Sequence, residues 1–217
     1  VENVNFDIAP GEVLGLVGES GSGKSVTAKA LMQLNAGNTV YDDTSRITLN
    51  LPDTAPLEVL DLKRERDMKP IRGGAISMIF QEPMASFAPA ITIGDQMIEQ
   101  LLLHSDMNKK RAREISIEML DRVGILQPSE RIDQYAFEFS GGMRQRAMIA
   151  MALSTKPKLL IADEPTTALD VTIQAQVLDL MRDLVADFGM GILFITHDLG
   201  VIAQTADRVA VMYLGRI

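Results

Sequence analysis

An octapeptide that can wrap a phosphate group lies near the start of the chain, at residues 18–25. It fits the phosphate-loop pattern of a glycine, four residues and then Gly-Lys-Ser, in which backbone N–H groups bind phosphate oxygens. Apolar residues 13–17 predict a buried strand before the loop, and residues 25–34 predict a helix that begins at the phosphates. The sequence therefore predicts a nucleoside triphosphate site, made by Gly18, Glu19, Ser20, Gly21, Ser22, Gly23, Lys24 and Ser25.

The composition limits the class of protein that this chain can be. Its 217 residues, 47% of them apolar, are enough for one large α/β domain with a full hydrophobic core. A net charge of −8 argues against general nucleic-acid binding, which needs a basic face to neutralise phosphates. The absence of cysteine excludes disulfides and cysteine-ligated metals, and it fits a reducing compartment. No apolar run approaches the roughly 18 residues that a membrane-spanning helix needs.

The two ends of the sequence indicate a domain that belongs to a longer chain. The sequence begins with Val1 rather than Met, and no signal peptide precedes the first apolar pattern. At the other end, residues 213–217 resemble a strand that stops midway through a hairpin. We therefore expect a fragment of a longer protein.

Apolar stretches that alternate with helical patterns predict an α/β fold. Strands alternating with helices imply a mostly parallel sheet that is covered by helices. The expected buried strands lie at residues 13–17, 75–80, 159–162, 191–196 and 209–214, and the expected helices at 25–34 and 172–187. Shorter alternating patterns near the N-terminus, at residues 4–8 and 46–51, predict additional strands, and an apolar pattern resumes at residues 57–62.

A run of helical spacing interrupts this alternation. Apolar residues recur at helical intervals from Ile93 to Val123, and His104 in this run is expected on the surface. Four basic residues are expected to form a solvated helix face: Lys109, Lys110, Arg111 and Arg113. We interpret residues 88–137 as an inserted helical lobe. The chain would then be a single domain, 1–217, with a core of residues 1–87 and 138–217.

Polar side chains stand at the ends of three predicted strands. Asp163 is placed to hold Mg²⁺ beside the phosphate loop, whereas Glu164 points differently and can orient or deprotonate an attacking water. Gln81 can ligate Mg²⁺ or touch that water, and His197 can reach a γ-phosphate. Each would more often be an ordinary polar strand end if it stood alone. Beside a phosphate loop, they predict a catalytic site.

A second candidate anion site begins another helix at Ser140-Gly141-Gly142. Ser140 is a good N-cap, and the two glycines expose backbone N–H groups beside the positive end of the helix dipole. An isolated motif of this kind would be an ordinary capped helix after a Gly-Gly turn. Together with the phosphate loop, it predicts a second group that binds phosphate.

These elements together resemble the nucleotide-binding domain of ATP-binding cassette (ABC) transporters. The similarity covers residues 1–217, and the signature Ser140-Gly141-Gly142 is its discriminating element, because other phosphate-loop ATPases lack it. The motifs occur in the family's order: the phosphate loop, a glutamine loop at Gln81, the signature, Asp163-Glu164 with Ala168-Leu169-Asp170, and a switch histidine at His197. The resemblance implies a phosphate-loop NTPase core with a mostly parallel sheet, an N-terminal antiparallel β subdomain and an inserted α-helical lobe.

The resemblance also implies ligands and roles. ATP and Mg²⁺ would bind between two cassettes in a head-to-tail dimer, where the signature of one chain faces the phosphate loop of the other. The residues with catalytic roles would be Lys24, Gln81, Glu164 and His197. The ion would be held by Ser25, Gln81 and Asp163, and the second cassette would contribute Ser140, Gly141 and Gly142.

Finer features resemble one branch of the family, the ATPases of bacterial and archaeal peptide and nickel importers. That branch shares the stretch Gln81–Phe87, the run Thr92-Ile93-Gly94 and the extended signature 140–146. Departures occur at Glu82, Ala88 and Ala136-Phe137, where the branch usually has Asp, Asn and Pro-His, and the segment 35–72 is longer than usual. An aromatic residue that stacks on adenine would precede residue 1, and a cysteine-bearing extension would follow residue 217.

The resemblance implies an ATP-hydrolysing subunit of an importer for peptides or a related solute. Its partners would be membrane permease subunits, a second nucleotide-binding domain and, indirectly, a periplasmic or extracellular solute-binding protein, but no nucleic acid. It would lie on the cytoplasmic face of the inner membrane as a peripheral protein. One alternative is a soluble ABC ATPase of DNA repair or ribosomes. Another is a small-molecule or nucleotide kinase, which shares the phosphate loop but has no use for the signature.

Overall fold

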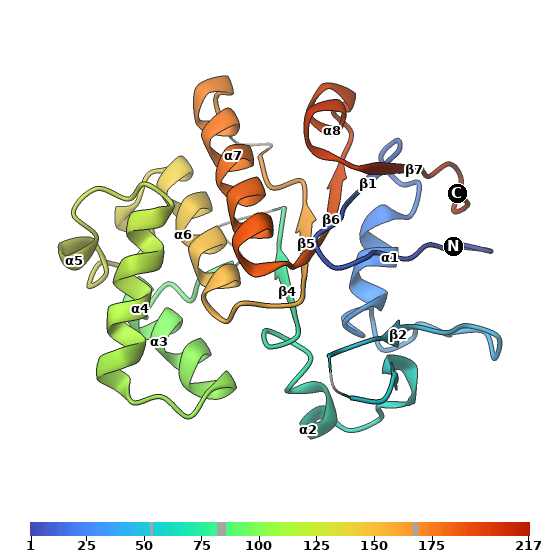
Figure 1. Ribbon diagram of the computed structural model, residues 1–217, viewed down its shortest axis with the longest axis horizontal. Helices are drawn as coiled ribbons and strands as arrows, with labels where there is room; N and C mark the ends of the chain where they lie inside the picture. The colour runs from blue at the N-terminus through green and yellow to red at the C-terminus, as the bar shows by residue number, and fades with distance from the viewer. Residues whose placement is uncertain (53, 82–85, 167–168) are drawn as a thin grey trace.

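A computed structural model shows one central sheet with helices on both sides and a helical lobe (Figure 1). The structure describes residues 1–52, 54–81, 86–166 and 169–217, with Leu184 described by its backbone alone. The strands are β1 (Val13–Val17), β2 (Thr48–Leu49), β3 (Leu57–Glu58), β4 (Ile76–Ile79), β5 (Leu159–Asp163), β6 (Gly191–Thr196) and β7 (Arg208–Val211). The α-helices are α1 (Lys24–Ala30), α2 (Glu65–Met68), α3 (Ile93–His104), α4 (Lys109–Arg122), α5 (Pro128–Arg131), α6 (Gly141–Ser154), α7 (Val171–Phe188) and α8 (Leu199–Thr205).

Five parallel strands form the central sheet in the order β4-β5-β6-β1-β7. β1 lies between β6 and β7, with Val13 opposite Ile192 and Leu14 opposite Arg208. Because all five strands run in one direction, their carboxyl ends meet at one edge of the sheet. β2 and β3 form a separate antiparallel pair. The fold class expected from the sequence is confirmed.

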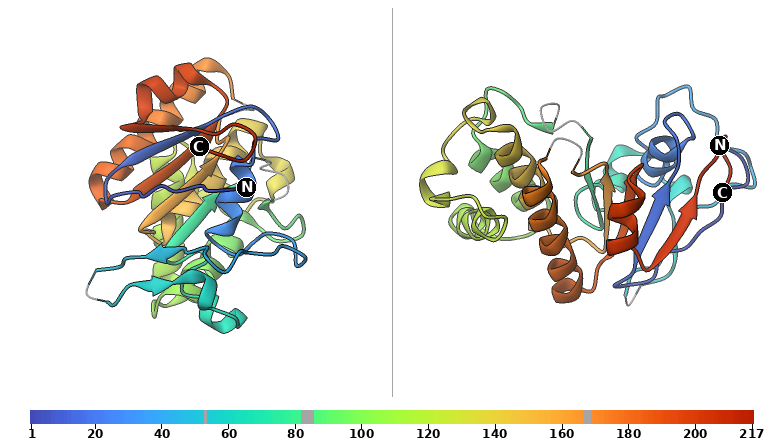
Figure 2. Two further views of the ribbon diagram at one scale, coloured as in Figure 1. Left: turned by 90° about the vertical axis from the view of Figure 1, so that its right-hand side faces the viewer. Right: turned by 90° about the horizontal axis from the view of Figure 1, so that it is seen from above.

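Alternate side chains of the sheet enter two separate hydrophobic cores, as the two-residue period of a strand requires. On one face, Leu14 and Leu16 of β1 belong to a core that includes Ala28 of α1. On the other face, Val17 belongs to a core that includes Ile149 of α6. Helices α1 and α6 therefore cover opposite faces of the sheet, and the views in Figures 1 and 2 agree.

The helical lobe is built from α3, α4 and α5, which come after the edge strand β4 in the chain. Thr92 Oγ1 accepts from the Asp95 N–H at 3.1 Å and caps α3, while Asn108 Oδ1 accepts from the Arg111 N–H at 2.9 Å and caps α4. Fully buried Met97 from α3 joins the core beneath α6, so the lobe is packed against the sheet domain. In the described parts of the chain, no helix combines the length and the apolar character that a bilayer crossing requires.

Residues 1–12 form no strand, contrary to the prediction for residues 4–8. Half-buried Val4, Phe6 and Ile8 nevertheless pack against the core on the α1 face. Alternation reports that one side of a segment is buried, whereas a strand also needs a neighbouring backbone at hydrogen-bonding distance. The strand predicted at residues 46–51 was too long, because β2 covers only Thr48–Leu49. It pairs with β3, which begins the apolar segment 57–62.

Two further predictions were wrong near surface turns. β7 ends at Val211 rather than at Leu214, and the chain turns shortly afterwards at Leu214 and Gly215, whose φ values are +46° and +79°. His104 is half-buried rather than on the surface: a Cβ on Gly73 would lie 2.8 Å from its Nε2. Burial lowers the pKa of His104, and the charge of Lys69 lowers it further.

Gly94 in the first turn of α3 leaves no room for a side chain. A Cβ there would lie 2.7 Å from the carbonyl oxygen of Ile132, which also accepts the Gly94 N–H. We expect Gly94→Ala to lower the free energy of unfolding by about 1–3 kcal/mol, because backbone atoms cannot move aside as side chains do. Gly37→Ala, where a Cβ would meet no atom of the described residues within 4 Å, is the matched control. Equal melting temperatures for the two variants would contradict the expectation.

Candidate nucleotide-hydrolysis site

The phosphate loop turns sharply between β1 and α1 on glycines that other residues could not replace without strain. Gly21 and Gly23 have φ values of +79° and +110°. A Cβ on Gly18 would lie 2.1 Å from the carbonyl oxygen of Met212, so this glycine lets the loop pass against the chain that follows β7. The buried hydroxyl of Ser22 has no hydrogen-bond partner among the described residues. The glycines therefore shape the loop, and the Ser22 hydroxyl is a donor whose hydrogen bond a bound phosphate oxygen could accept.

Lys24 is held inside this loop. Its Nζ donates to the carbonyl oxygens of Gly18 at 2.7 Å and Glu19 at 2.9 Å, and only 7% of the residue is exposed. The loop therefore carries a desolvated positive charge at the start of α1, where the helix dipole also favours anions.

Asp163 ends β5 directly beside this loop. The residue is 5% exposed, and burial raises the pKa of its carboxyl group. A hydrogen bond with Ser25 lowers that pKa, and the charge of Glu164 raises it. Charges on Lys29 and Lys24 lower it by smaller amounts. The net direction is upward, so burial outweighs the contacts that stabilise the charged carboxylate.

Glu164 lies at the centre of three side chains that come from three strand ends. Gln81 Nε2 donates to its Oε2 at 3.1 Å, and His197 Nδ1 lies 3.0 Å from its Oε1. Its backbone has a φ of +48°, a left-handed conformation that costs a non-glycine residue about 1–2 kcal/mol. The Glu164 N–H donates to the Ile195 carbonyl at 2.9 Å, which ties this turn to β6. The carboxylate is therefore positioned by both side chains and backbone.

The signature residues form an open helix start. Ser140 Oγ accepts from the Met143 N–H at 3.3 Å and caps α6, as its sequence predicts. Among the described residues, a Cβ on Gly141 would meet nothing within 4 Å, and one on Gly142 would meet only Leu169 Cδ2, at 3.6 Å. This helix covers the face of the sheet opposite to α1 (Figure 2).

The structure thus brings together part of the predicted site. It joins Gln81, Glu164 and His197, and it joins Ser25 with Asp163. It does not join the signature to the phosphate loop within one chain, because their helices lie on opposite faces of the sheet.

Several supporting contacts were not predicted from the sequence. The carbonyl oxygens of Met212 and Ile195 shape the loop and the Glu164 turn, and backbone groups carry no residue-type signal. Thr27 Oγ1 donates to the Gly23 carbonyl at 3.0 Å; a threonine one turn into a helix is a recognisable signal for this bond. Five motif residues lie outside the described residues: Glu82, Pro83, Met84, Ala85 and Ala168.

The donor set suits a magnesium ion that arrives with a nucleotide. In the ranges that the structure describes, no group of three or more His, Cys, Asp or Glu side chains could hold a metal ion. Mg²⁺ is usually bound by one or two protein oxygens together with substrate phosphates rather than by a protein cage. The Ser25 hydroxyl and the buried Asp163 carboxylate provide such oxygens side by side. The residues therefore fit the ion.

Comparison with known proteins decides the family. The family described as "ABC transporter" matches residues 1–167 of the chain. The chain belongs to the ABC transporter family. Within this family it is 52% identical to the oligopeptide transport ATP-binding protein OppD of Bacillus subtilis, over all of the chain and 59% of OppD. It is 50% identical to the dipeptide transport ATP-binding protein DppD of the same organism, over all of the chain and 63% of DppD.

A solved structure of another ABC protein has the same fold. The dimeric ATP-binding cassette MJ0796, bound to ADP and phosphate in a post-hydrolysis state, matches with a TM-score of 0.81 and 26% identity. The match covers 99% of this chain and 87% of that one. In contrast, the chain spans only about three fifths of OppD and DppD.

The raised pKa of Asp163 makes the effect of pH on stability testable. Because its pKa is higher in the folded than in the unfolded protein, the charged carboxylate destabilises the fold near neutral pH. We expect Asp163→Asn to raise the melting temperature near neutral pH. The gain should shrink as the pH falls towards the ordinary aspartate pKa of about 3.9, where both states of the wild type become protonated.

Exposed Asp43 provides the control for this experiment, because Asp43→Asn removes a carboxylate that water already solvates. Melting temperatures of the two variants and the wild type are compared across the acidic and neutral range. A gain for Asp163→Asn that does not change with pH would contradict the assigned cause.

Proposed function

We propose that this chain is the ATP-hydrolysing cassette of an ABC importer that drives uptake of peptides or a related solute. The observation that carries the proposal is Glu164, held between Gln81 and His197 at the sheet edge where the phosphate loop also begins. The names of OppD and DppD, an oligopeptide and a dipeptide transport protein, favour peptides as the solute class.

The proposed hydrolysis uses each of these groups for one task. Glu164 accepts a proton from the attacking water, and the contacts of its carboxylate with Gln81 and His197 hold it in position for this task. His197, with 62% of its side chain exposed, can also reach the γ-phosphate. Lys24 and the loop N–H groups neutralise the phosphate oxygens.

We assign the magnesium ion to Ser25, Asp163 and Gln81. When bound, the ion would neutralise charge on the phosphate oxygens during phosphoryl transfer. The amide nitrogen of Gln81 is engaged with Glu164, so its carbonyl oxygen is the atom that would take the ion. The raised pKa of Asp163 is consistent with a carboxylate that becomes fully stable only beside a cation.

We also propose that a second cassette completes the site, either a copy of this chain or a sister subunit. Two phosphate-binding helix starts on opposite faces of one sheet cannot enclose the same nucleotide within one chain. In a head-to-tail pair, Ser140, Gly141 and Gly142 of one cassette would face Lys24 of the other. The dimeric form of MJ0796 with ADP and phosphate supports this arrangement.

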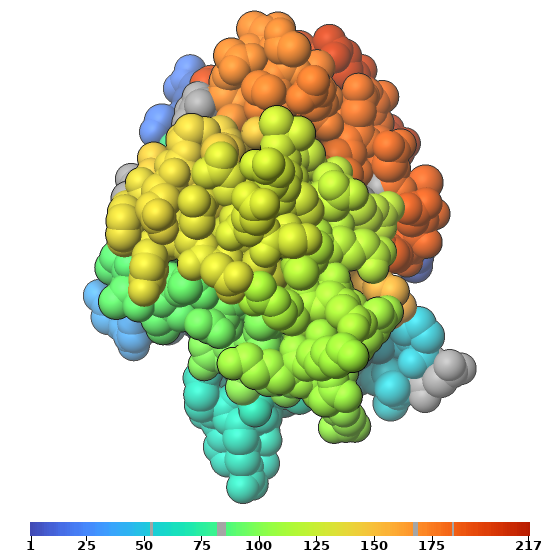
Figure 3. All heavy atoms as spheres, turned by 90° about the vertical axis from the view of Figure 1, so that its left-hand side faces the viewer, coloured from blue at the N-terminus to red at the C-terminus, as the bar shows by residue number. Residues whose placement is uncertain are grey.

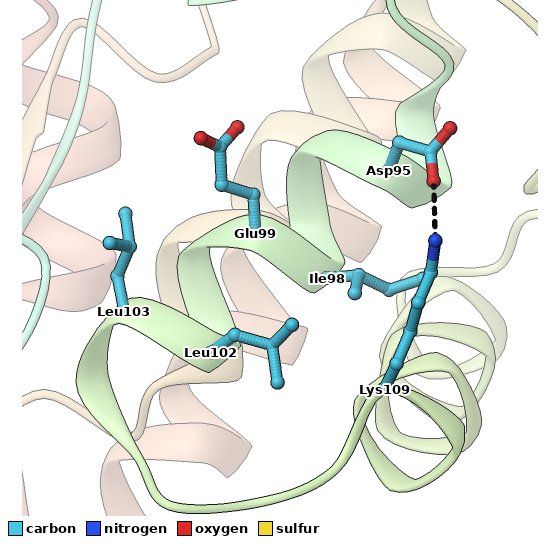
Figure 4. A pocket seen from close by; sticks show the side chains of 6 residues that line it. All are labelled: Asp95, Ile98, Glu99, Leu102, Leu103 and Lys109. Atoms are coloured by element: carbon cyan, nitrogen blue, oxygen red, sulfur yellow. Dashed lines mark ion pairs between the residues drawn. The ribbon is translucent and has the colours of Figure 1, made fainter.

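An apolar groove on the helical lobe is the surface that we assign to the permease subunits (Figure 4). Its volume is about 270 Å³, and Leu102 and Leu103 along it are 40% and 50% exposed. Lys109 pairs with Asp95 at its rim, at 3.7 Å. Contiguous exposed apolar surface is typical of protein interaction sites, and these two leucines contribute such surface to the lobe. The cassette would then lie on the cytoplasmic face of the inner membrane, and a solute-binding protein on the other side would act through the permease.

The lobe carries this contact as a separate part of one domain. We propose the division into a core of residues 1–87 and 138–217 and a lobe of residues 88–137, because α3, α4 and α5 all fall within the latter range. Net charge and the names of the relatives both favour an importer over an ATPase of DNA repair or ribosomes.

Replacing the proposed base tests the chemistry. We expect Glu164→Gln to retain ATP binding but to lower the hydrolysis rate by about a thousandfold or more, because an amide cannot accept the proton. Glu118→Gln, on the exposed side of α4, is the control and should hydrolyse ATP normally. Phosphate release and nucleotide binding are measured for both. Undiminished turnover in Glu164→Gln would remove this residue from the mechanism.

Mixing two inactive variants tests the composite site. Lys24→Ala removes the loop cation, and Gly141→Glu adds a negative charge where the fold has room for a side chain. In a mixed dimer one site carries both defects and the other carries none, so equal mixing should restore about a quarter of wild-type hydrolysis. The matched control mixes each variant with itself. A mixture no more active than its components would contradict pairing between copies of this chain.

A further inference from the structure

The segment from Lys63 to Arg72 concentrates positive charge in an otherwise acidic chain. It holds five basic and two acidic residues, a net charge of +3, so the rest of the chain carries −11 to give −8 in total. The segment includes α2, and it projects from the body of the molecule (teal in Figure 3). We call this segment, residues 63–72, the basic projection.

Ion pairs within the basic projection neutralise its two acidic residues. Arg64 pairs with Asp67 at 2.7 Å, and Arg72 pairs with Glu65 at 2.7 Å, so both acids are already neutralised. Three exposed cations then remain to act on the surroundings: Lys63, Arg66 and Lys69. Lys63 donates to the uncharged carbonyl of Leu60, and Arg66 lies 3.6 Å from the Asp67 that Arg64 holds.

The basic projection is anchored rather than loose. Met68 and Ile71 are 2% and 3% exposed and belong to the core on the α1 face. The Arg72 guanidinium donates to the carbonyl oxygens of Met32 at 2.8 Å and Gln33 at 3.0 Å, just beyond the end of α1. A surface of cations held in this way loses little conformational entropy when it meets a partner.

The basic projection stands beside the groove on the lobe. His104 ends α3 directly after Leu102 and Leu103, and its ring covers Gly73 at the base of the projection. The charge of Lys69 reaches His104 and lowers its pKa. A permease seated in the groove would therefore bring the membrane to the same side of the molecule as these cations.

We propose that the basic projection contacts the anionic lipid headgroups of the membrane beside the permease. The location of the cassette beside a membrane rests on the proposed function. The choice of lipid as the partner rests on the charge and shape of the projection. A convex set of cations fits a flat anionic layer, and the segment has no aromatic side chain on which nucleic-acid bases would stack. The acidic remainder of the molecule is repelled by the same layer, so the contact also orients the cassette.

The experiment measures sedimentation of the protein with vesicles of phosphatidylcholine alone and of phosphatidylcholine mixed with anionic phosphatidylglycerol. We expect binding only to the mixed vesicles, weakening with added salt. A triple variant, Lys63→Gln with Arg66→Gln and Lys69→Gln, should lose about fivefold in binding for each charge removed. The matched control replaces three exposed cations elsewhere, Lys110, Lys158 and Arg182, by Gln and should bind like the wild type.

Three outcomes would overturn the proposal: equal binding to both kinds of vesicle, equal losses in the two triple variants, or loss of permease assembly in detergent by the Lys63, Arg66 and Lys69 variant. The last result would assign the cations to a protein partner. Hydrolysis of ATP without lipid should be unchanged, because these residues lie outside the nucleotide site. A protein that binds anionic vesicles but hydrolyses no ATP would contradict the proposed function and leave the lipid contact standing.

Discussion

Five parallel strands that end at one edge are the constraint on which this structure depends. A parallel sheet places the carboxyl ends of distant segments side by side, so residues far apart in sequence can share one small volume. Gln81, Glu164 and His197 follow β4, β5 and β6, which are consecutive neighbours in the sheet. The phosphate loop follows β1, the next strand along. The chemistry proposed for this cassette is an outcome of strand order.

The same sheet separates α1 and α6, the two helices whose starts we propose to bind phosphate. Its alternating side chains belong to one core beneath α1 and another beneath α6, and the sheet lies between the two helices. A nucleotide held at the start of α1 therefore leaves the start of α6 to serve a different molecule. Within this geometry, a second cassette is the simplest way for both helix starts to act on one triphosphate, as we propose.

Positive charge is concentrated in one short segment of the chain. The acidic excess covers most of the chain, while the basic projection gathers a net +3 within ten residues and fixes it to the end of α1 through Arg72. His104 joins this projection to the groove end of α3. Core, lobe and projection thus meet around one half-buried imidazole, whose position follows from contacts between distant segments.

The sequence by itself determined the elements that local chemistry controls. Glycines and Lys24 define the phosphate loop, Ser140 caps its helix, and apolar runs mark β1, β5 and β6 almost to the residue. The signature in its order also identified the family that the comparisons confirmed. Such features are predictable because each depends on residues within one turn or one strand.

Only the tertiary structure decided what depends on distant neighbours. The alternation of Val4, Phe6 and Ile8 reported burial, but these residues do not pair with another segment as a strand. His104 is half-buried against Gly73, a contact that no local pattern contains. The order of the strands gave the Glu164 carboxylate its partners. The two faces of the sheet separated the signature from the phosphate loop. Neither could be predicted locally, because packing between segments is not encoded in any one segment.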